Sequence, residues 1–237
     1  MTTAALEVVA AAKHFGPVRV VDAINLTVVA GETVALVGPN GAGKTTLLNV
    51  LSGQLRVTSG SIRLSGRDVT ARHPSHPDRR PMLRSFQNGG VFGKLSAAEN
   101  VALAAVARGV ARAAAETAGR AALDRVGLQL VADWRADMLS GGQRKLIDFA
   151  RLLVTRPDVA LLDEPTAGVS PAIMETMREI LQNERRRGLA TIIVSHDLPW
   201  VYDLCDRVLV LGNGRRLAEG SPAEVSANPL VQEAYLG

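Results

Sequence analysis

The sequence predicts a mixed α/β fold built on a parallel sheet, and three short apolar runs carry this prediction. Residues 34–37, 159–162 and 191–194 are of strand length and consist almost entirely of aliphatic side chains. Runs of this kind are typical of strands that are buried on both faces. Each run is followed by residues suited to chemistry: a glycine loop, a pair of acids, or Ser-His-Asp. Ligands of such sheets bind at the carboxyl ends of the strands, so these residues are the candidate functional groups.

Composition limits the protein classes that fit. The chain has 237 residues, of which 47 % are hydrophobic and 21 % charged, as in ordinary globular proteins. Its one cysteine, Cys205, excludes an internal disulfide and a thiolate metal site. The net charge of +4 is mild, and its arginine groups fit solvated helix ends and loops, with an acidic partner or phospholipid headgroups as the alternative. Neither a signal peptide nor an apolar run of 18 residues is found, so we expect a cytosolic protein.

The first 30 residues favour a small antiparallel sheet. Apolar runs at 6–10, 18–21 and 24–29 are rich in valine and separated by turn residues. Phe15 lies in an expected turn at 13–16. An aromatic ring there could stack on an adenine, although composition alone favours a residue of a satellite core.

A phosphate-binding loop follows the first apolar run. Residues 38–45 match the pattern G-x-x-x-x-G-K-[ST], and the helix-compatible residues 47–51 come next. Glycines allow successive backbone N–H groups to face a phosphate, and the helix N-terminus favours an anion. Lys44 can reach the β- and γ-phosphates, and the Thr45 hydroxyl can ligate Mg²⁺. The loop predicts nucleotide binding by Gly38, Pro39, Asn40, Gly41, Ala42, Gly43, Lys44, Thr45 and Thr46.

The middle of the chain predicts a helical subdomain inserted at approximately 88–156. A short strand at 83–87 ends in the polar residue Gln87. Ser96 and Glu99 have the spacing of a capping box that opens a helix through about residue 108, and a second helix is expected at 112–126. Before this region, residues 71–81 are expected to form a loop, and its two histidines are not expected to bind metal.

A second glycine-bearing turn at 139–143 precedes the acidic strand. Ser140 is a suitable N-cap for a helix over 143–155, whose apolar positions have helical spacing. In the strand that follows, Asp163 can hold Mg²⁺ through water and Glu164 can polarise an attacking water. Pro171 suits the first position of a helix to about residue 187.

The remaining elements complete the sheet. His196 follows the strand at 191–194, where it could contact a γ-phosphate. A last strand at 208–211 turns at 212–214, and the chain is expected to end in a short capped helix from Ser221 and a closing segment.

These motifs together resemble the ATP-binding-cassette (ABC) transporter ATPase family over essentially the whole chain. In the family's order, residues 38–45 resemble its phosphate loop, Gln87 its Q-loop, 139–143 its signature, 159–164 its second nucleotide strand and His196 its switch histidine. The resemblance identifies Phe15 with the family's adenine-stacking aromatic. It implies one ABC ATPase domain over 1–237: a P-loop NTPase (RecA-like) core, an N-terminal antiparallel β subdomain and the inserted helices.

The resemblance also implies how such a protein works. Two ATPase chains, identical or sister subunits, would form a head-to-tail dimer that encloses two ATP molecules with Mg²⁺. The signature residues of one chain would close on the γ-phosphate held by the other chain's loop. Glu164 would act as general base, His196 would stabilise the transferring charge, and Thr45, Gln87 and Asp163 would hold the metal. The signature residues are Ser140, Gly141, Gly142 and Gln143.

A narrower resemblance points to uptake of small solutes. Residues 84–87, 163–171 and 234–237 are similar to the ATPase subunits of branched-chain amino-acid and urea importers. The chain differs from that branch at Ser170, where Asp or Asn is common, and lacks the long middle insertion of some amino-acid importers, which leaves urea and related amides open.

The implied partners are membrane-embedded permease subunits and, indirectly, an external solute-binding protein. The groove around 88–94 would receive a short permease helix, which places the chain in the cytoplasm, peripheral at the inner face of the cell membrane. Alternatives are an exporter ATPase of the lipopolysaccharide-extraction kind and a soluble ABC protein acting on ribosomes or DNA. A second cassette, a long coiled coil and an extended basic tail are all missing, so no nucleic-acid partner is expected.

Overall fold

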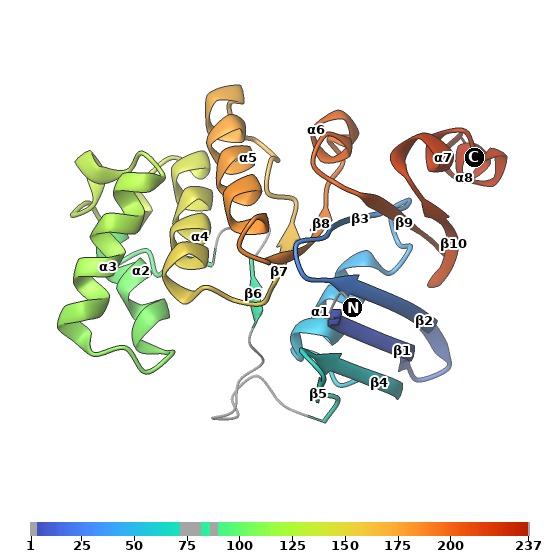
Figure 1. Cartoon of the computed structure of the whole chain (residues 1–237). Helices are drawn as coiled ribbons and strands as arrows, with labels where there is room; N and C mark the ends of the chain where they lie inside the picture. The colour runs from blue at the N-terminus through green and yellow to red at the C-terminus, as the bar shows by residue number, and fades with distance from the viewer. Residues whose placement is uncertain (1–3, 72–81, 86–89, 237) are drawn as a thin grey trace. The chain divides into compact units, whose positions relative to one another are not determined.

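The computed structural model describes residues 4–71, 82–85 and 90–236. These residues form two compact units, which Figure 1 shows together. The first unit comprises Met1–Arg84, Asp158–Glu164 and Glu184–Gly237. The second comprises Ser85–Pro157 and Pro165–Asn183, so it contains the residues at 88–156 for which inserted helices were expected.

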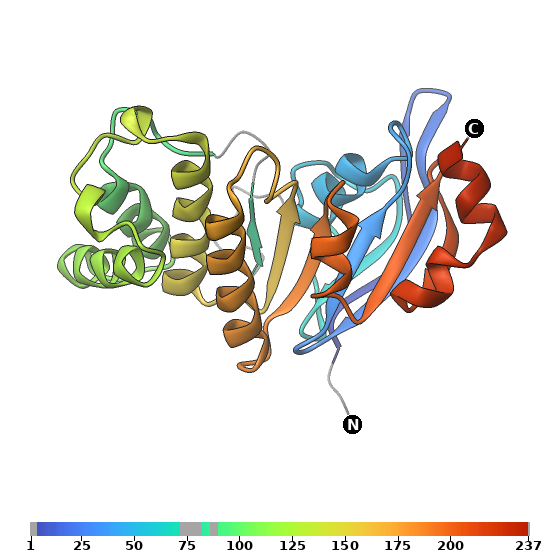
Figure 2. The same ribbon diagram turned by 90° about the horizontal axis from the view of Figure 1, so that it is seen from above.

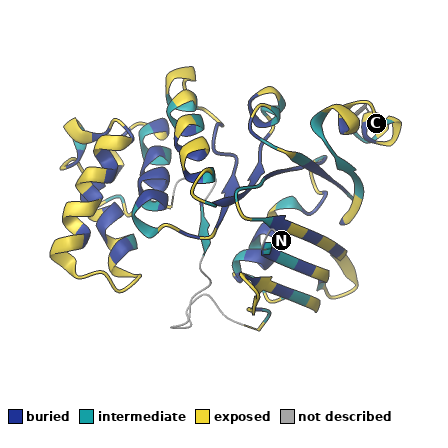
Figure 3. Cartoon of the chain, viewed as in Figure 1, coloured by how far each residue is buried: buried dark blue, intermediate teal, exposed yellow. Residues whose placement is uncertain are grey.

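The larger sheet of the first unit contains the three apolar strands from which the fold was predicted. They are β3 (Thr33–Val37), β7 (Val159–Asp163) and β8 (Ala190–Val194), and every residue in them is buried (Figure 3). The order across the sheet is β10-β9-β3-β8-β7-β6. All neighbouring pairs are parallel except β9 with β10. The other strands are β6 (Met82–Arg84), β9 (Arg207–Gly212) and β10 (Arg215–Gly220).

The smaller sheet is antiparallel, as predicted, but its strands are longer than expected. It contains β1 (Ala4–Phe15), β2 (Val18–Val29), β4 (Ser59–Leu64) and β5 (Arg67–Asp68), in the order β2-β1-β4-β5. Ala10 and Ala23 have positive φ angles of 46° and 55° where the β1–β2 register shifts. These positions are bulges inside two continuous strands, and not turns between short ones. Phe15 ends β1 and pairs with Val18.

Helix α1 (Lys44–Ser52) shares one hydrophobic core with both sheets. Its buried Leu47 and Leu51 belong to the same cluster as Leu6 of β1 and Leu36 of β3. The core thereby fixes the start of α1 relative to the end of β3. The remaining helices of this unit are α6 (Leu198–Tyr202), α7 (Pro222–Ser226) and α8 (Pro229–Leu236). The expected closing segment is therefore a second helix.

The second unit is helical, and capping boxes define two of its helices. Ser96 and Glu99 cap α2 (Ala97–Val106), and Ser140 and Gln143 cap α4 (Gly141–Thr155), which begins two residues earlier than expected. Helices α4 and α5 (Pro171–Arg185) lie side by side in Figures 1 and 2. Also present are α3 (Arg112–Arg125) and short 3₁₀ turns at Gln129–Val131 and Ala136–Met138. None of the helices in the described ranges is long and apolar enough to cross a membrane.

Candidate functional site

The larger sheet brings the predicted functional residues of the first unit to one edge. Strands β3, β8 and β7 are neighbours and run parallel, so their carboxyl ends lie side by side. The glycine loop follows β3, His196 lies two residues beyond β8, and Glu164 follows β7. In open α/β sheets this edge is where ligands bind.

Two glycines of the loop are required by the close approach of other backbone segments. A Cβ atom on Gly38 would lie 2.3 Å from the Leu211 carbonyl oxygen, and one on Gly43 would lie 2.5 Å from the Val20 carbonyl oxygen. Both residues also have φ values, 151° and 99°, that side chains rarely adopt. Any side chain at 38 or 43 would push the loop away from β9 or β2, which explains the glycine spacing.

Lys44 folds back over the loop that precedes it. Its Nζ donates hydrogen bonds to the carbonyl oxygens of Gly38 (2.7 Å) and Pro39 (3.0 Å). Burial lowers the pKa of Lys44, while the charges of Glu164 and Asp163 act in the opposite direction. The ammonium group therefore lies over the loop, and the N–H groups that now donate to carbonyl oxygens can donate to phosphate oxygens instead. The next residue, Thr45, is exposed in the first turn of α1.

Glu164 is held in an unusual backbone conformation beside His196. Its φ is 50°, in the left-handed region, and its N–H donates to the Val194 carbonyl (2.8 Å). The carboxylate is buried, and it accepts a hydrogen bond from the His196 backbone N–H (3.2 Å). Its other oxygen lies 3.3 Å from His196 Nε2, whose side chain is 65 % exposed. A carboxylate placed in this way can take a proton from a water at the sheet edge.

Asp163 is tied to helix α1 by a buried arginine that the sequence did not indicate as functional. Arg84 Nη2 lies 3.5 Å from Asp163 Oδ2, and the two side chains are 8 % and 7 % exposed. The same guanidinium donates to Ser52 Oγ (3.2 Å) and to Asn49 Oδ1. Burial lowers the pKa of Arg84, and Asp163 opposes this. The sequence feature that could have indicated the role of Arg84 is its position as a charged residue inside the expected strand at 83–87.

Replacing Arg84 with Met is expected to destabilise the chain, because it leaves the buried Asp163 carboxylate without its cation. Breaking a buried ion pair from one side costs about 3 kcal/mol or more of unfolding free energy. Urea unfolding of Arg84→Met measures this. The matched change Arg63→Met removes an exposed arginine paired with Glu7 and should lower stability much less. Equal losses in the two variants would show that the buried pair has no special role.

In the second unit, Ser140 forms the start of helix α4. Its Oγ accepts the Gln143 N–H (3.2 Å), and Gln143 Oε1 accepts the Ser140 N–H (2.9 Å). Gly141 faces open space, whereas a Cβ on Gly142 would lie 2.8 Å from Ile173 Cδ1. Ser140 and Gly141 are exposed at the N-terminus of a 15-residue helix, where N–H groups and the helix dipole favour an anion.

Of the remaining predicted site residues, the structure describes Phe15 but not Gln87. Phe15 is 47 % exposed, and Lys13 Nζ lies 5.0 Å from its ring centroid, which argues against a core residue. Gln87 lies outside the described residues, as do His73 and His76 of the expected loop.

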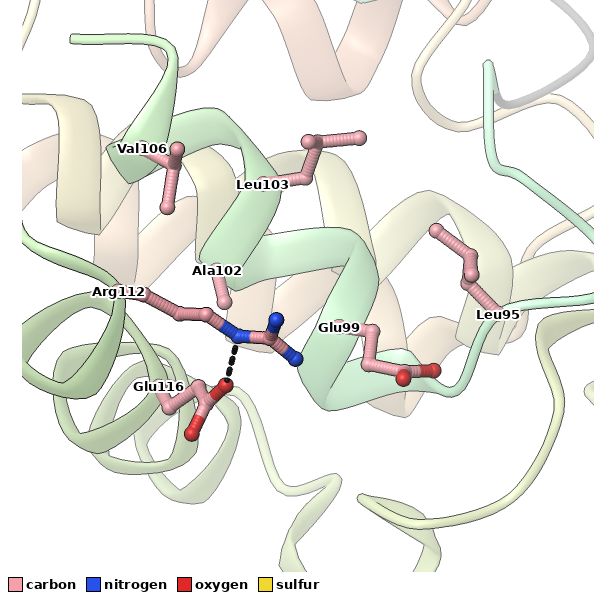
Figure 4. Close-up of a pocket in the computed structure, with 7 residues that line it drawn as sticks. All are labelled: Leu95, Glu99, Ala102, Leu103, Val106, Arg112 and Glu116. Atoms are coloured by element: carbon pink, nitrogen blue, oxygen red, sulfur yellow. Dashed lines mark hydrogen bonds and ion pairs between the residues drawn. The ribbon is translucent and has the colours of Figure 1, made fainter. Parts of the chain in front are cut away.

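A groove of about 300 Å³ runs along α2 and α3 (Figure 4). On the α3 side, Arg112 Nε pairs with Glu116 Oε1, one turn along the same helix, at 2.9 Å. The expected permease groove at 88–94 does not coincide with it, since none of the described residues 90–94 lines it. The lining residues are Leu95, Glu99, Ala102, Leu103, Val106, Arg112 and Glu116.

Comparison with known families gives two matches. The model described as "ABC transporter" matches residues 21–167, more than half of the chain. A second model, described as "Branched-chain amino acid ATP-binding cassette transporter", matches residues 215–237.

Several characterised proteins are similar over nearly their whole length. The high-affinity branched-chain amino acid transport ATP-binding protein BraF of Pseudomonas aeruginosa is 32 % identical over 100 % of this chain and 99 % of its own. LivG of Escherichia coli, with the same description, is 33 % identical over 94 % of each chain. The lipopolysaccharide export system ATP-binding protein LptB of Acidithiobacillus ferridurans is 35 % identical over 92 % of this chain and 90 % of its own.

Solved structures agree with these matches. The crystal structure of a nucleotide-free ATP-binding cassette from an ABC transporter superposes with a TM-score of 0.89, at 27 % identity and full coverage of both chains. The ADP conformation of another such cassette gives 0.86 at 28 % identity, covering 100 % of this chain and 99 % of the other. The predicted fold class, a P-loop NTPase core with an antiparallel β subdomain and added helices, is confirmed.

Proposed function

This chain belongs to the ABC transporter family as an ATP-binding subunit, and we propose from this premise that it powers solute import through a separate membrane permease. Membership makes it an ATPase coupled to transport, which confirms that part of the sequence interpretation. The proposed solute is a branched-chain amino acid, urea or a related amide. The match of residues 215–237 to the branched-chain amino-acid model carries this proposal, and the names of BraF and LivG support it.

In the proposed reaction, the glycine loop binds ATP, and the residues that follow β7 and β8 carry out the hydrolysis. The backbone N–H groups of 38–46 and Lys44 hold the phosphates of ATP, and Phe15 stacks on the adenine. Glu164 accepts a proton from the attacking water, and its fixed position beside His196 supports this role. His196, exposed at the same edge, donates toward the charge that develops on the γ-phosphate.

The donor set at the edge also fits Mg²⁺, which we propose as the metal cofactor. Magnesium is usually held by one or two carboxylates together with substrate phosphates, and not by a complete protein cage. Asp163, with the exposed hydroxyl of Thr45 and the amide of Gln87, would supply the protein ligands. Bound there, the metal would neutralise charge on the β- and γ-phosphates.

We further propose that two chains, identical or sister subunits, enclose ATP between them. The exposed N-terminus of α4 favours binding of an anion. A phosphate of ATP held by the loop of another chain would supply that anion. Ser140, Gly141, Gly142 and Gln143 would make this contact. Both units would then act as one ATPase domain over 1–237.

The dimer would work at the cytoplasmic face of the membrane, bound to the permease around residues 88–94. A solute-binding protein outside the membrane would act on it only indirectly. No nucleic acid takes part in this scheme.

Uptake by cells tests the proposed substrate class. Cells lacking the gene and carrying either the wild-type chain or Glu164→Gln are given labelled leucine, urea and short amides. We expect uptake of at least one of these labelled solutes to require the wild-type chain, because only that chain completes ATP turnover. Equal uptake of all of them in both strains would contradict the import proposal.

The similarity to LptB supports a second candidate, an exporter ATPase that extracts lipopolysaccharide. The permease that copurifies with the tagged chain separates the two. An importer permease favours uptake, whereas lipopolysaccharide export components favour the second candidate. Ribosomes or RNA in place of a membrane protein would contradict both.

A further inference from the structure

The hairpin turn between β9 and β10 packs directly against the phosphate loop. Asn213 and Gly214 form this two-residue turn with φ angles of 48° and 78°, and Gly212 pairs with Arg215 across it. The Gly214 N–H donates to the carbonyl oxygen of Ala42 at 3.1 Å. Ala42 lies inside the loop and is 2 % exposed. The turn therefore supports the middle of the loop that is proposed to hold the phosphates of ATP.

The same turn is hydrogen-bonded to β2. The Gly214 carbonyl oxygen accepts the Asp22 N–H at 2.8 Å, and Arg215 donates from Nε (2.9 Å) and Nη2 (2.7 Å) to Asp22 Oδ2. The hydrogen bonds from Arg215 lower the pKa of Asp22. A Cβ on Gly214 would lie 2.6 Å from the Val20 carbonyl oxygen, the atom that a Cβ on Gly43 would approach to 2.5 Å. Strand β2 therefore lies against both the turn and the phosphate loop.

Strand β2 leads from these contacts to the aromatic ring that is proposed to stack on adenine. Its first residue, Val18, pairs with Phe15 at the end of β1. Asp22 follows Val18 by four residues, which is about 13 Å along a strand. The turn between β9 and β10 therefore links the hairpin that carries Phe15 to the loop that would hold the phosphates.

We propose that Gly214, Arg215 and Asp22 are positioning residues that hold the hairpin of β1 and β2 at the distance from the phosphate loop at which one ATP molecule contacts both. Two linked groups of a ligand reinforce each other's binding only where the geometry lets both engage at once. The inference rests on the proposed function, in which Phe15 stacks on the adenine and residues 38–46 hold the phosphates. Inorganic triphosphate has no base, so its binding should not depend on this distance.

Titration calorimetry with ATP and with inorganic triphosphate tests this role. EDTA is present to chelate Mg²⁺, so that under the proposed mechanism ATP is neither hydrolysed nor enclosed between two chains. The wild-type chain should bind ATP about tenfold or more tightly than triphosphate, because a base stacked on an aromatic ring has an effect of this size.

In Gly214→Ala, the added Cβ must separate the turn from the Val20 carbonyl oxygen. The preference for ATP over triphosphate should therefore fall at least about fivefold. The affinity for triphosphate should stay within about twofold of the wild-type value, because the hydrogen bonds of Lys44 within the loop are unchanged.

Gly66→Ala is the matched control for backbone strain. Gly66 follows Ser65 in the turn between β4 and β5, and its φ of 77° is nearly that of Gly214. A Cβ on Gly66 meets nothing within 4 Å. The change should therefore cause similar strain and leave the preference for ATP intact.

Arg215→Met serves if Gly214→Ala does not fold. It removes the side-chain hydrogen bonds to Asp22 and keeps the backbone of the turn, so the preference for ATP should fall at least about threefold. Its control is Arg216→Met, which removes the next arginine of β10, paired with Glu219, and should leave the preference unchanged.

The possible outcomes are distinct. A preference for ATP that changes by less than about twofold in Gly214→Ala, or in Arg215→Met where the first variant does not fold, overturns the inference. An equal loss of affinity for ATP and triphosphate also overturns it, since the turn would then be merely structural, as does an equal loss of preference in Gly66→Ala. These outcomes leave the proposed function standing. A wild-type chain with no preference for ATP contradicts the proposed stacking on Phe15, and the inference with it.

Discussion

Glu164→Gln is expected to reduce ATP turnover by about 10³-fold while leaving ATP binding intact, because it removes the proposed general base and keeps the shape of the side chain. Glutamine can still accept the His196 N–H, so the edge of the sheet should keep its structure. With hydrolysis blocked, ATP and Mg²⁺ should hold two chains together. Phosphate release at saturating ATP and size-exclusion chromatography with ATP measure the two effects.

The control for this variant is Glu7→Gln. Glu7 lies in β1, and its exposed side chain pairs with Arg63, so the same chemical change there should alter neither turnover nor assembly. Wild-type turnover in Glu164→Gln would show that another group activates the water.

Lys44→Ala should instead weaken ATP binding by about 100-fold. The ammonium group offers charge-assisted hydrogen bonds to two phosphates, and together these are worth about 3 kcal/mol. The fold should tolerate the change, since Gly38 and Pro39 lose only the donors that Lys44 provides to their carbonyl oxygens. Titration calorimetry with a non-hydrolysable ATP analogue measures the affinity.

Arg63→Ala removes one positive charge from the same unit and is the matched control, with affinity expected to remain unchanged. Titration curves that superpose for Lys44→Ala and the wild-type chain would contradict the assignment of the phosphate loop.

The strands of the parallel sheet could be predicted from the sequence because a strand buried on both faces is a continuous apolar run. Such a run can be recognised without knowing which strands lie beside it. The same reasoning misjudged β1 and β2, since the bulges at Ala10 and Ala23 are set by pairing across the sheet. Asn25 Oδ1, for example, accepts the Ala10 N–H at 2.9 Å. A local break in the apolar pattern looks the same for a turn and for a bulge.

In the candidate site, too, some residues could be predicted from the local sequence and others could not. Its loop, acids and histidine lie at strand ends, where residue type and position already indicate chemistry. Arg84 and Arg215 were not indicated, because their roles depend on Asp163 and Asp22, which lie 79 and 193 positions away in the chain. Such pairs become visible only when the fold brings them together.

In the proposed dimer, each ATP site is shared between the phosphate loop of one chain and the signature residues of the other. Gly141→Asp is a suitable probe of the signature side, because a Cβ on Gly141 meets nothing within 4 Å and the added carboxylate would repel phosphate. Acidic residues in the first turn also suit a helix, so α4 should form normally.

Mixing Lys44→Ala chains with Gly141→Asp chains tests the shared site directly. A mixed dimer contains one site with both defects and one with none, whereas dimers of either variant alone contain two defective sites. We predict that the equimolar mixture hydrolyses ATP at least about tenfold faster than the two variants measured separately. A mixture no faster than their average would contradict the account, because it would place each complete site within a single chain.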